Sequence, residues 1–182
     1  MSKYLKNIIF EFIRNWPDFL YGVHLRKYFY NKELNTSFYY IGKGCVIDRI
    51  EATQIGSNVI LGENVKLIIS AMAKCYIGDN VGIADGVYIR SANHNFSDIN
   101  IDILAQGHTW RKVFFNNNDY GIVIERNVWI GARAILLSGS HIGEGSVISA
   151  GSVVSSIVPP YSIVVGNPGR IVGNRKAKTN LI

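Results

Sequence analysis

An aliphatic residue recurs at every sixth position over much of this chain, and this period constrains the fold more than any other feature. From residue 124 onward, six consecutive hexads begin at Ile124, Ile130, Leu136, Ile142, Ile148 and Val154. Earlier series with the same step begin at Ile41, Ile47, Ile55, Leu61, Leu67, Ile77, Ile83 and Ile89. A period of six fits neither an α-helix nor the alternation of one long strand. It is typical of a solenoid.

In such a solenoid, each hexad supplies one short strand with an inward aliphatic side chain. Three strands make a triangular coil of about 18 residues, and neighbouring coils pair at roughly 4.8 Å. Each coil buries its apolar face only by stacking on the next. The composition agrees, because 18 glycines and only 4 prolines suit many tight turns between short strands. The alternative is a conventional β-sandwich, and six hexads in one register argue against it.

Two segments interrupt the repeat. The shorter one lies between Leu67 and Ile77, and the longer one covers residues 91–122. A long insertion without repeats in a compact solenoid is either a functional loop or disordered. Its aromatic residues favour an ordered loop that packs on another part of the protein.

Residues 1–32 differ from the repeats. Leu5, Ile8, Ile9, Phe12, Ile13 and Trp16 follow the spacing of an amphipathic helix, and Pro17 limits or restarts it. One interpretation is an arm that packs on the coil end or on a neighbouring subunit. The other is a basic, aromatic element that contacts a membrane surface.

Charge is concentrated at the two ends of the chain. The net charge is +6, with six Lys/Arg against two Asp/Glu in residues 1–32 and four Lys/Arg in residues 170–182. No aromatic and basic stripe crosses the near-neutral body, so we expect no nucleic-acid partner. Two cysteines make no disulfide framework, no secretory signal or membrane span is convincing, and we expect a cytoplasmic protein.

One of the four histidines stands out as a candidate general base. His94 opens the long insertion directly after a repeat strand, so a rigid edge holds it beside a loop. A metal site is the rival interpretation, but the histidines are at least 14 residues apart and their spacing does not indicate one. We therefore expect no metal.

Three runs of the repeat region carry a family resemblance. They are Val128–Ala132, Ile142–Val154 and Pro159–Pro168, and the Asn93–Phe96 segment resembles a catalytic-histidine loop. Together they resemble the hexapeptide-repeat acyltransferases, in particular the sugar and polysaccharide O-acetyltransferases.

The resemblance implies an all-β fold, a left-handed parallel β-helix, and a homotrimer with active sites in the clefts between subunits. On this basis we expect a helical arm over residues 1–40, the β-helix over 41–172 with the insertion 91–122, and a basic tail over 173–182. The implied acyl donor is acetyl coenzyme A.

The resemblance also assigns roles to residues. His94 is the expected general base, worth roughly 10²–10⁴-fold in rate, and Trp129 is the expected donor to the oxyanion, or else an apolar residue in a subunit seam. Asn93, Asn95 and Trp110 are the expected acceptor-binding residues. Asp98, Asp102 or a carbonyl of a neighbouring chain are the candidates for orienting the base.

The expected coenzyme site combines small residues with cations. Its members are Trp129, Gly131, Ala132, Ala150, Gly151, Ser155, Arg170, Arg175 and Lys176. Solenoid turns also require small residues, and a basic tail can simply be solvated. Family members often carry Thr-Lys where this chain has Ser155-Ser156, which removes an expected cation.

The sequence thus predicts an acetyl coenzyme A-dependent O-acetyltransferase that modifies a saccharide hydroxyl during surface polysaccharide or glycan synthesis. A lipid-linked acceptor is a further hypothesis, with the arm as a candidate contact with the inner membrane face. The alternatives are an N-acetyltransferase for a nucleotide-linked amino sugar, an antibiotic-acetylating enzyme, a γ-type carbonic anhydrase, or a non-catalytic solenoid that only binds.

Overall fold

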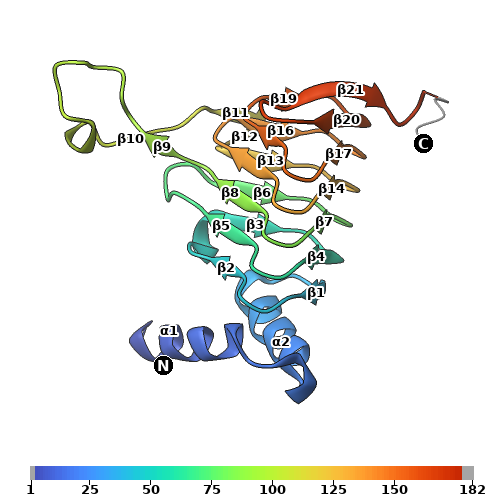
Figure 1. Ribbon diagram of the computed structural model, residues 1–182. Helices are drawn as coiled ribbons and strands as arrows, with labels where there is room; N and C mark the ends of the chain where they lie inside the picture. The colour runs from blue at the N-terminus through green and yellow to red at the C-terminus, as the bar shows by residue number, and fades with distance from the viewer. Residues whose placement is uncertain (1–2, 178–182) are drawn as a thin grey trace.

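The computed structural model describes residues 3–177 and shows a three-sided coil of parallel strands with a helical arm at its N-terminal end (Figure 1). The arm consists of α1 (Lys3–Arg14), a single 3-10 turn η1 (Asp18–Leu20) and α2 (Gly22–Leu34). None of the helices in this part of the chain is long and apolar enough to cross a membrane.

Each side of the coil is one sheet, and we name the three sides faces A, B and C in chain order. Face A contains β1 (Phe38–Ile41), β4 (Val59–Leu61), β7 (Gly82–Ile83), β14 (Trp129–Ile130), β17 (Val147–Ile148), β20 (Ser162–Val165) and β21 (Arg170–Asn174). Face B contains β2 (Val46–Ile47), β5 (Lys66–Ile68), β8 (Tyr88–Arg90), β15 (Ile135–Leu137) and β18 (Val153–Val154). Face C contains β3 (Thr53–Ile55), β6 (Cys75–Ile77), β13 (Ile122–Ile124), β16 (Ser140–Ile142) and β19 (Ile157–Val158).

The predicted hexad positions form the core. On face A the register aligns Ile41, Leu61, Ile83, Ile130, Ile148 and Val164 in one column, and faces B and C carry equivalent columns. All fourteen aliphatic residues that begin the predicted hexads are buried. The prediction of a three-sided solenoid is therefore confirmed, because one aliphatic side chain per strand points inward and stacks on the same position of the next coil.

The corners of the coil require residues that can adopt a positive φ. Between faces C and A, the left-handed backbone conformation falls on Asn58, Asn80, Asn127, Gly145 and Tyr161, one in each successive coil. Asparagine and glycine adopt positive φ more readily than other residues, which is why they recur there.

The insertion holds two antiparallel hairpins and leaves the coil at the corner between faces B and C. The first hairpin pairs β9 (Asn93–His94) with β10 (His108–Thr109), and the 3-10 turn η3 (Ile103–Ala105) lies in the loop between them. This hairpin projects away from the coil, on the side opposite to β14 (Figure 1). The second hairpin, β11 (Val113–Phe115) with β12 (Asn118–Tyr120), packs its Val113, Phe115 and Tyr120 against Tyr76 and Val123 of face C. A short 3-10 turn, η2 (Ile50–Ala52), bridges faces B and C in the first coil.

The ends of the coil extend slightly beyond the expected boundaries. The first strand begins at Phe38, within the segment expected to be the arm. The last strand, β21, runs antiparallel to β20 as far as Asn174, within the segment expected to be the tail. Residues 178–182 of that expected tail lie outside the described residues.

Candidate functional site

The candidate base His94 lies exposed on the projecting hairpin, and its partner there is another histidine. Because β9 and β10 pair in antiparallel register, His94 lies opposite His108, and the two ring centroids are 4.6 Å apart. The register also sets Asn93 opposite Thr109, one residue before Trp110. His108 was missing from the predicted site, because only the hairpin pairing brings it to His94 across 14 residues of chain.

Neither of the two carboxylates expected to orient His94 bonds to its ring. Asp98 accepts hydrogen bonds from the backbone and side chain of Asn100. Asp102 precedes η3 and makes no side-chain capping bond there. Among residues 3–177 no carboxylate bonds to the His94 ring, so within one chain the ring of His108 is its neighbour.

The predicted acceptor-binding residues share the hairpin but differ in their contacts. The backbone N–H of Asn95 donates to the Gly107 carbonyl at 3.0 Å. The side-chain oxygen of Asn95 accepts from the backbone N–H and the hydroxyl of Ser97. Trp110 has the Lys112 ammonium 5.6 Å from its ring centroid. Asn95 therefore shapes the hairpin, whereas Trp110 carries a cation on its face.

A small cavity lies at the base of this hairpin. It has a volume of about 260 Å³, and its lining includes Asp48, Arg49, Ser70, Arg90 and His108. The Arg90 guanidinium is held in place, because its Nε donates to the Ala92 carbonyl at 2.9 Å and one terminal nitrogen donates to the Tyr88 hydroxyl at 3.2 Å. The cavity thus offers both charges and a hydroxyl beside the histidine pair, which suits a polar ligand.

Trp129 lies on the other side of the molecule, on face A. Trp129 is 47% exposed, and its ring lies against Gly82 of the preceding coil, where a β-carbon would meet the indole at 2.5 Å. Only glycine at position 82 leaves room for this ring position. The register, Trp129 opposite Gly82, therefore determines where the indole lies.

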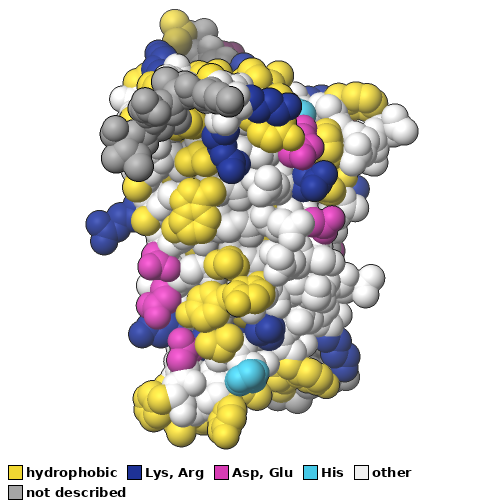
Figure 2. Space-filling model, turned by 90° about the vertical axis from the view of Figure 1, so that its right-hand side faces the viewer, with side chains coloured by type: hydrophobic (Ala, Val, Ile, Leu, Met, Phe, Trp, Pro, Cys, Tyr) yellow, Lys and Arg dark blue, Asp and Glu magenta, His cyan; other side chains and the backbone are white. Residues whose placement is uncertain are grey.

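The Trp129 side chain forms part of an open groove of about 430 Å³ that also includes the predicted cation Arg175. Tyr39, Asn80 and Asn127 are among its other lining residues. The Arg175 guanidinium donates to the Gly145 carbonyl, which holds it at this groove. Figure 2 views the molecule from this side and shows hydrophobic side chains gathered along the face.

The four small residues predicted for the coenzyme gather at the corner between faces A and B. Gly131 packs against the next coil so closely that a β-carbon would meet the Ala150 nitrogen at 2.5 Å. The Gly151 N–H donates to the Ala132 carbonyl at 2.9 Å, and Gly151 has a φ of +69°. Ala132, Ala150 and Gly151 line an open cavity of about 600 Å³, together with Glu63, Asp85 and Arg133. Small side chains therefore leave a channel along this corner.

The remaining predicted coenzyme residues are dispersed. The Lys176 ammonium lies 3.9 Å from the centroid of the Tyr161 ring, and Arg170 bonds to the adjacent Gly169 carbonyl. A hydrogen bond from the Tyr161 hydroxyl to the Glu144 carboxylate raises the pKa of that phenol. Ser155 lies between β18 and β19, and its carbonyl accepts from the Arg111 guanidinium at 3.1 Å. Arg111 was not among the predicted site residues. Its guanidinium nevertheless lies beside Ser155-Ser156, the pair that replaces the lysine common in the family.

A carboxylate and an imidazole form a pair on face C. His141 Nε2 is 2.6 Å from Glu125 Oε1, and the Phe115 ring of the β11–β12 hairpin packs on the imidazole. The other Glu125 oxygen accepts the Glu144 N–H at 3.0 Å. The Phe115 contact joins the second hairpin to the coil, and Glu125 holds the imidazole that it packs on. Within the described part of the chain, no group of three or more His, Cys, Asp and Glu side chains has an arrangement that could hold a metal.

Comparison with known proteins identifies the same hexapeptide repeat. Residues 121–156 match the bacterial transferase hexapeptide family, a model of six repeats. A probable acetyltransferase of Mycobacterium tuberculosis is 34% identical over 123 residues, which cover 68% of this chain and 37% of that protein. Putative acetyltransferases of Saccharomyces cerevisiae and Staphylococcus aureus are each 36% identical, and the match covers 56% and 57% of their lengths. The chain therefore spans less than two thirds of each of these relatives.

Solved structures resemble a larger part of the chain. A maltose O-acetyltransferase from Clostridium difficile has a TM-score of 0.72 at 27% identity, over 94% of this chain and 84% of that one. A hexapeptide-repeat acetyltransferase from Vibrio cholerae, complexed with acetyl coenzyme A, has a TM-score of 0.64 at 24% identity, over 91% and 82%. The resemblance to hexapeptide-repeat acyltransferases is thus confirmed.

Proposed function

We propose that this chain, which carries bacterial transferase hexapeptide repeats, is an O-acetyltransferase that moves an acetyl group from acetyl coenzyme A to a saccharide hydroxyl. The similarity to a maltose O-acetyltransferase supports a saccharide acceptor. The acetyl coenzyme A bound by the Vibrio protein of the same fold supports the donor. We place the reaction in the synthesis of a surface polysaccharide or glycan in the cytoplasm.

One observation carries the proposed architecture of the site. His94 lies on a hairpin that projects from one side of the coil, and the Trp129 groove lies on the opposite side (Figure 1). A single chain therefore keeps the candidate base away from the candidate donor groove. In the proposed homotrimer, with its expected left-handed coils, the hairpin of one copy reaches the Trp129 groove of the next.

The proposed reaction is a direct transfer. The neutral His94 imidazole takes the proton from the acceptor hydroxyl while that oxygen forms a bond to the thioester carbonyl carbon. The carbon–sulfur bond then breaks, and the thiolate takes the proton from the imidazolium. The products are an acetyl ester and the free coenzyme thiol. Trp129 and backbone N–H groups are the proposed donors to the oxyanion.

The channel beside Ala132, Ala150 and Gly151 is the proposed path of the pantetheine arm, since no side chain of those residues fills it. Arg175 and Lys176 are the proposed contacts of the coenzyme phosphates, because both cations lie near the C-terminal end of the coil. Arg111 joins them as a cation beside Ser155.

The first test replaces the base. We expect His94→Ala to lower thiol release from acetyl coenzyme A, measured with a panel of saccharide acceptors, by roughly 10²–10⁴-fold. Coenzyme binding and the oligomer mass should remain unchanged, and His24→Ala, which changes another exposed histidine, should keep full activity. Unchanged turnover in His94→Ala would remove this residue from the mechanism. Turnover restricted to amine acceptors would favour the N-acetyltransferase alternative.

The second test asks whether His94 and Trp129 of one active site come from two different chains. His94→Ala and Trp129→Ala chains are each expected to be inactive, and unfolding and refolding them together gives mixed oligomers. If the site joins the hairpin of one copy to the groove of another, some mixed sites contain both native residues and activity returns. No recovery from a mixture that forms oligomers of normal mass would contradict the shared site.

A further inference from the structure

The outer surface of the N-terminal arm is unusually rich in exposed apolar and aromatic side chains. Phe19 is 84% exposed, Tyr21 is 75% exposed, and both flank Leu20 at the turn between α1 and α2. Further exposed apolar residues on the two helices are Ile8, Phe12, Leu25 and Tyr28. We call these seven residues the arm platform. In Figure 2 several hydrophobic side chains lie at the lower end of the molecule, which is the end that carries the arm in Figure 1.

The helical spacing explains why the exposed residues of each helix lie on one side of that helix. Ile8 and Phe12 are four residues apart on α1, and Leu25 and Tyr28 are three apart on α2, so each pair shares a helix face. The opposite sides of the helices pack on the coil, where Tyr30 is buried and Phe10 packs against the core. The arm therefore closes the open end of the coil with one side and presents apolar groups with the other.

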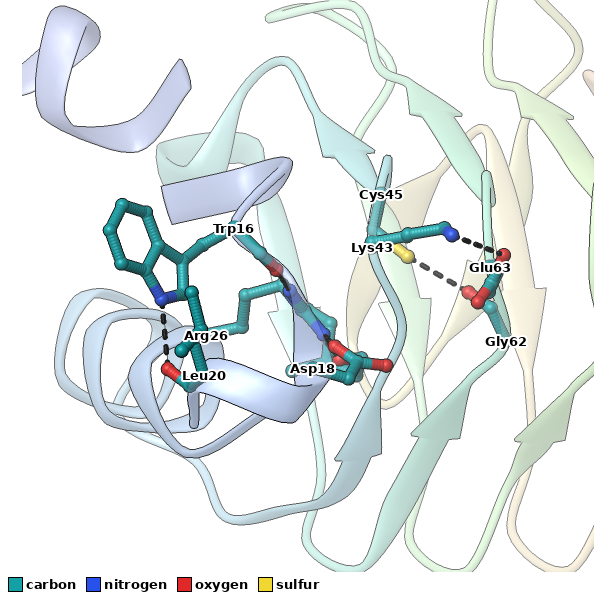
Figure 3. A network of polar contacts seen from close by, with 9 residues as sticks. Trp16, Asp18, Leu20, Arg26, Lys43, Cys45, Gly62 and Glu63 are labelled. Carbon is teal, nitrogen blue, oxygen red and sulfur yellow. Dashed lines mark hydrogen bonds and ion pairs between the residues drawn. The ribbon is translucent and has the colours of Figure 1, made fainter. Parts of the chain in front are cut away.

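A buried arginine fixes the turn that carries Phe19, Leu20 and Tyr21. Arg26 is fully buried, and its guanidinium donates to the Ile41 carbonyl at 2.9 Å, to the Trp16 carbonyl at 2.7 Å and to the Asp18 carboxylate (Figure 3). The Trp16 indole N–H donates to the Leu20 carbonyl at 2.8 Å. These bonds tie the turn to the first strand of the coil.

The backbone of the turn is also unusual. Tyr21 has a φ of +62°, a left-handed conformation that is uncommon for a bulky side chain. Such a conformation persists only where the surrounding structure enforces it, and it is often associated with function. Here it aims an aromatic side chain away from the protein.

Charge identifies the kind of surface that the arm platform fits. Residues 1–32 contain six Lys/Arg and two Asp/Glu. These two acids pair with Arg14 and Arg26, which leaves Lys3, Lys6, Lys27 and Lys32 as the lysines of the arm. Glu33 near the end of α2 brings the net charge of residues 1–34 to +3. Basic segments are attracted to anionic lipids, and aromatic side chains prefer the interface between headgroups and acyl chains.

We propose that the arm platform docks on an anionic lipid bilayer, with Phe19, Leu20 and Tyr21 inserted at the headgroup level. A shallow groove of about 600 Å³, lined by Ile8, Phe12, Trp16 and Pro17 with Glu11 and Asn15, offers further space for an acyl chain. The Arg26 contact makes the platform a preformed surface, so that docking needs no folding of the arm. This proposal stands apart from the acetyl transfer, because none of its residues belongs to the proposed active site.

The test compares two matched double variants of the full chain. Phe19→Ser/Leu20→Ser removes two side chains of the arm platform. Phe114→Ser/Leu104→Ser removes the same two residue types from the insertion, where they are 71% and 86% exposed, against 84% and 47% for Phe19 and Leu20. Flotation with vesicles of phosphatidylglycerol and phosphatidylcholine measures the bound fraction. We expect the arm variant to partition about tenfold or more weakly than the wild type, because it loses two inserted apolar groups. The insertion variant should float like the wild type.

Further measurements on the same samples distinguish docking on lipid from a contact between copies of the chain. High salt and pure phosphatidylcholine should both weaken flotation of the wild type, because the lysines act through charge. Equal flotation of both variants, or failure of the wild type to float, would refute docking. A lower oligomer mass in the arm variant would instead identify the platform as a contact between copies. Acetyl transfer to a soluble acceptor should not differ between the arm variant and the wild type, so failure of the docking proposal leaves the proposed function untouched.

Discussion

At the residue scale, the contact between Trp129 and Gly82 is the most specific requirement of the candidate donor groove. A β-carbon at position 82 would lie 2.5 Å from the indole ring, and Gly82 has no positive φ that would strain an alanine. The ring is the part that must move, because the side chain is flexible and the backbone is fixed by β-pairing. Position 82 therefore controls Trp129 without touching the proposed substrates.

We expect Gly82→Ala to displace the indole and to weaken acetyl coenzyme A use by about tenfold, measured as kcat/KM, because small misplacements of reacting groups are costly. The emission of Trp129 should shift as well. Gly173→Ala is the matched control, since its β-carbon meets only an ordinary contact at 3.8 Å. If both variants have the same kcat/KM, the position of the indole does not matter for transfer.

The two cysteines give a second prediction at this scale. Burial raises the pKa of the Cys45 thiol to about 11 and that of the Cys75 thiol to about 12. A raised pKa lowers the thiolate fraction, so at about pH 8 at most about one thiol in a thousand is reactive. We expect the native protein to be inert to a thiol reagent over minutes and to release two thiols when it is unfolded.

A control for this measurement is Ser97→Cys, which adds a thiol at an exposed site. It should react rapidly in the native state. Fast reaction of a native cysteine would show that the coil opens locally. The inertness of the native thiols also means that the coenzyme thiol released by turnover can be read without background from the protein.

At the element scale, Arg111 links the insertion to the coil. Its backbone N–H donates to the buried Ser138 hydroxyl at 2.8 Å, and its guanidinium reaches the Ser155 carbonyl at 3.1 Å. Its side chain also packs on Gly139, where a β-carbon would meet the Arg111 Cβ at 2.9 Å. Arg111 therefore fixes the segment between the two hairpins.

We expect Arg111→Ala to loosen the first hairpin, so that chymotrypsin cleaves the insertion several times faster and kcat falls. The free energy of unfolding should change by less than about 1 kcal/mol, because the contact is at the surface. Lys112→Ala is the neighbouring control, since Lys112 pairs with Asp119 within the second hairpin. Equal cleavage of the two variants would mean that Arg111 does not restrain the hairpin.

The elements also show where sequence reasoning succeeds and where it stops. The period of six placed the inward residues as far as Val154, because burial at one position per strand is a local pattern that repeats. It missed Val158 and Val164, the inward residues of the last coil on faces C and A, because a four-residue step from Val154 to Val158 breaks the period there. The pairing of His94 with His108 depends on where a hairpin turns, and no period marks that point. The contact of Arg175 with the Trp129 groove depends likewise on the reversal of β21. Such contacts join positions far apart in the chain, so a local pattern cannot specify them.

At the scale of the whole molecule, stability rests on three continuous columns of aliphatic side chains. Ile130 is fully buried on face A, between Ile83 and Ile148 of the adjacent coils. Because each coil contacts only its neighbours, a cavity in a central coil weakens the stacking on both sides.

We expect Ile130→Ala to lower the free energy of unfolding by about 2–5 kcal/mol, measured by urea denaturation. Ile157→Ala removes the same side chain from an exposed position on face C, where Ile157 is 69% exposed, and should change it by less than about 0.5 kcal/mol. Similar losses in the two variants would contradict a core formed by the inward columns alone.

The two ends of the coil are closed by different means. Helices α1 and α2 lie against the first coil, and β21 reverses direction to pair with β20 on the last one. A parallel solenoid with bare ends would present edges onto which another copy can add, and such growth produces filaments. Here the helices cover the first coil, and at the other end the antiparallel β21 occupies the edge of β20 on face A. A further parallel coil therefore cannot add to β20 on that face.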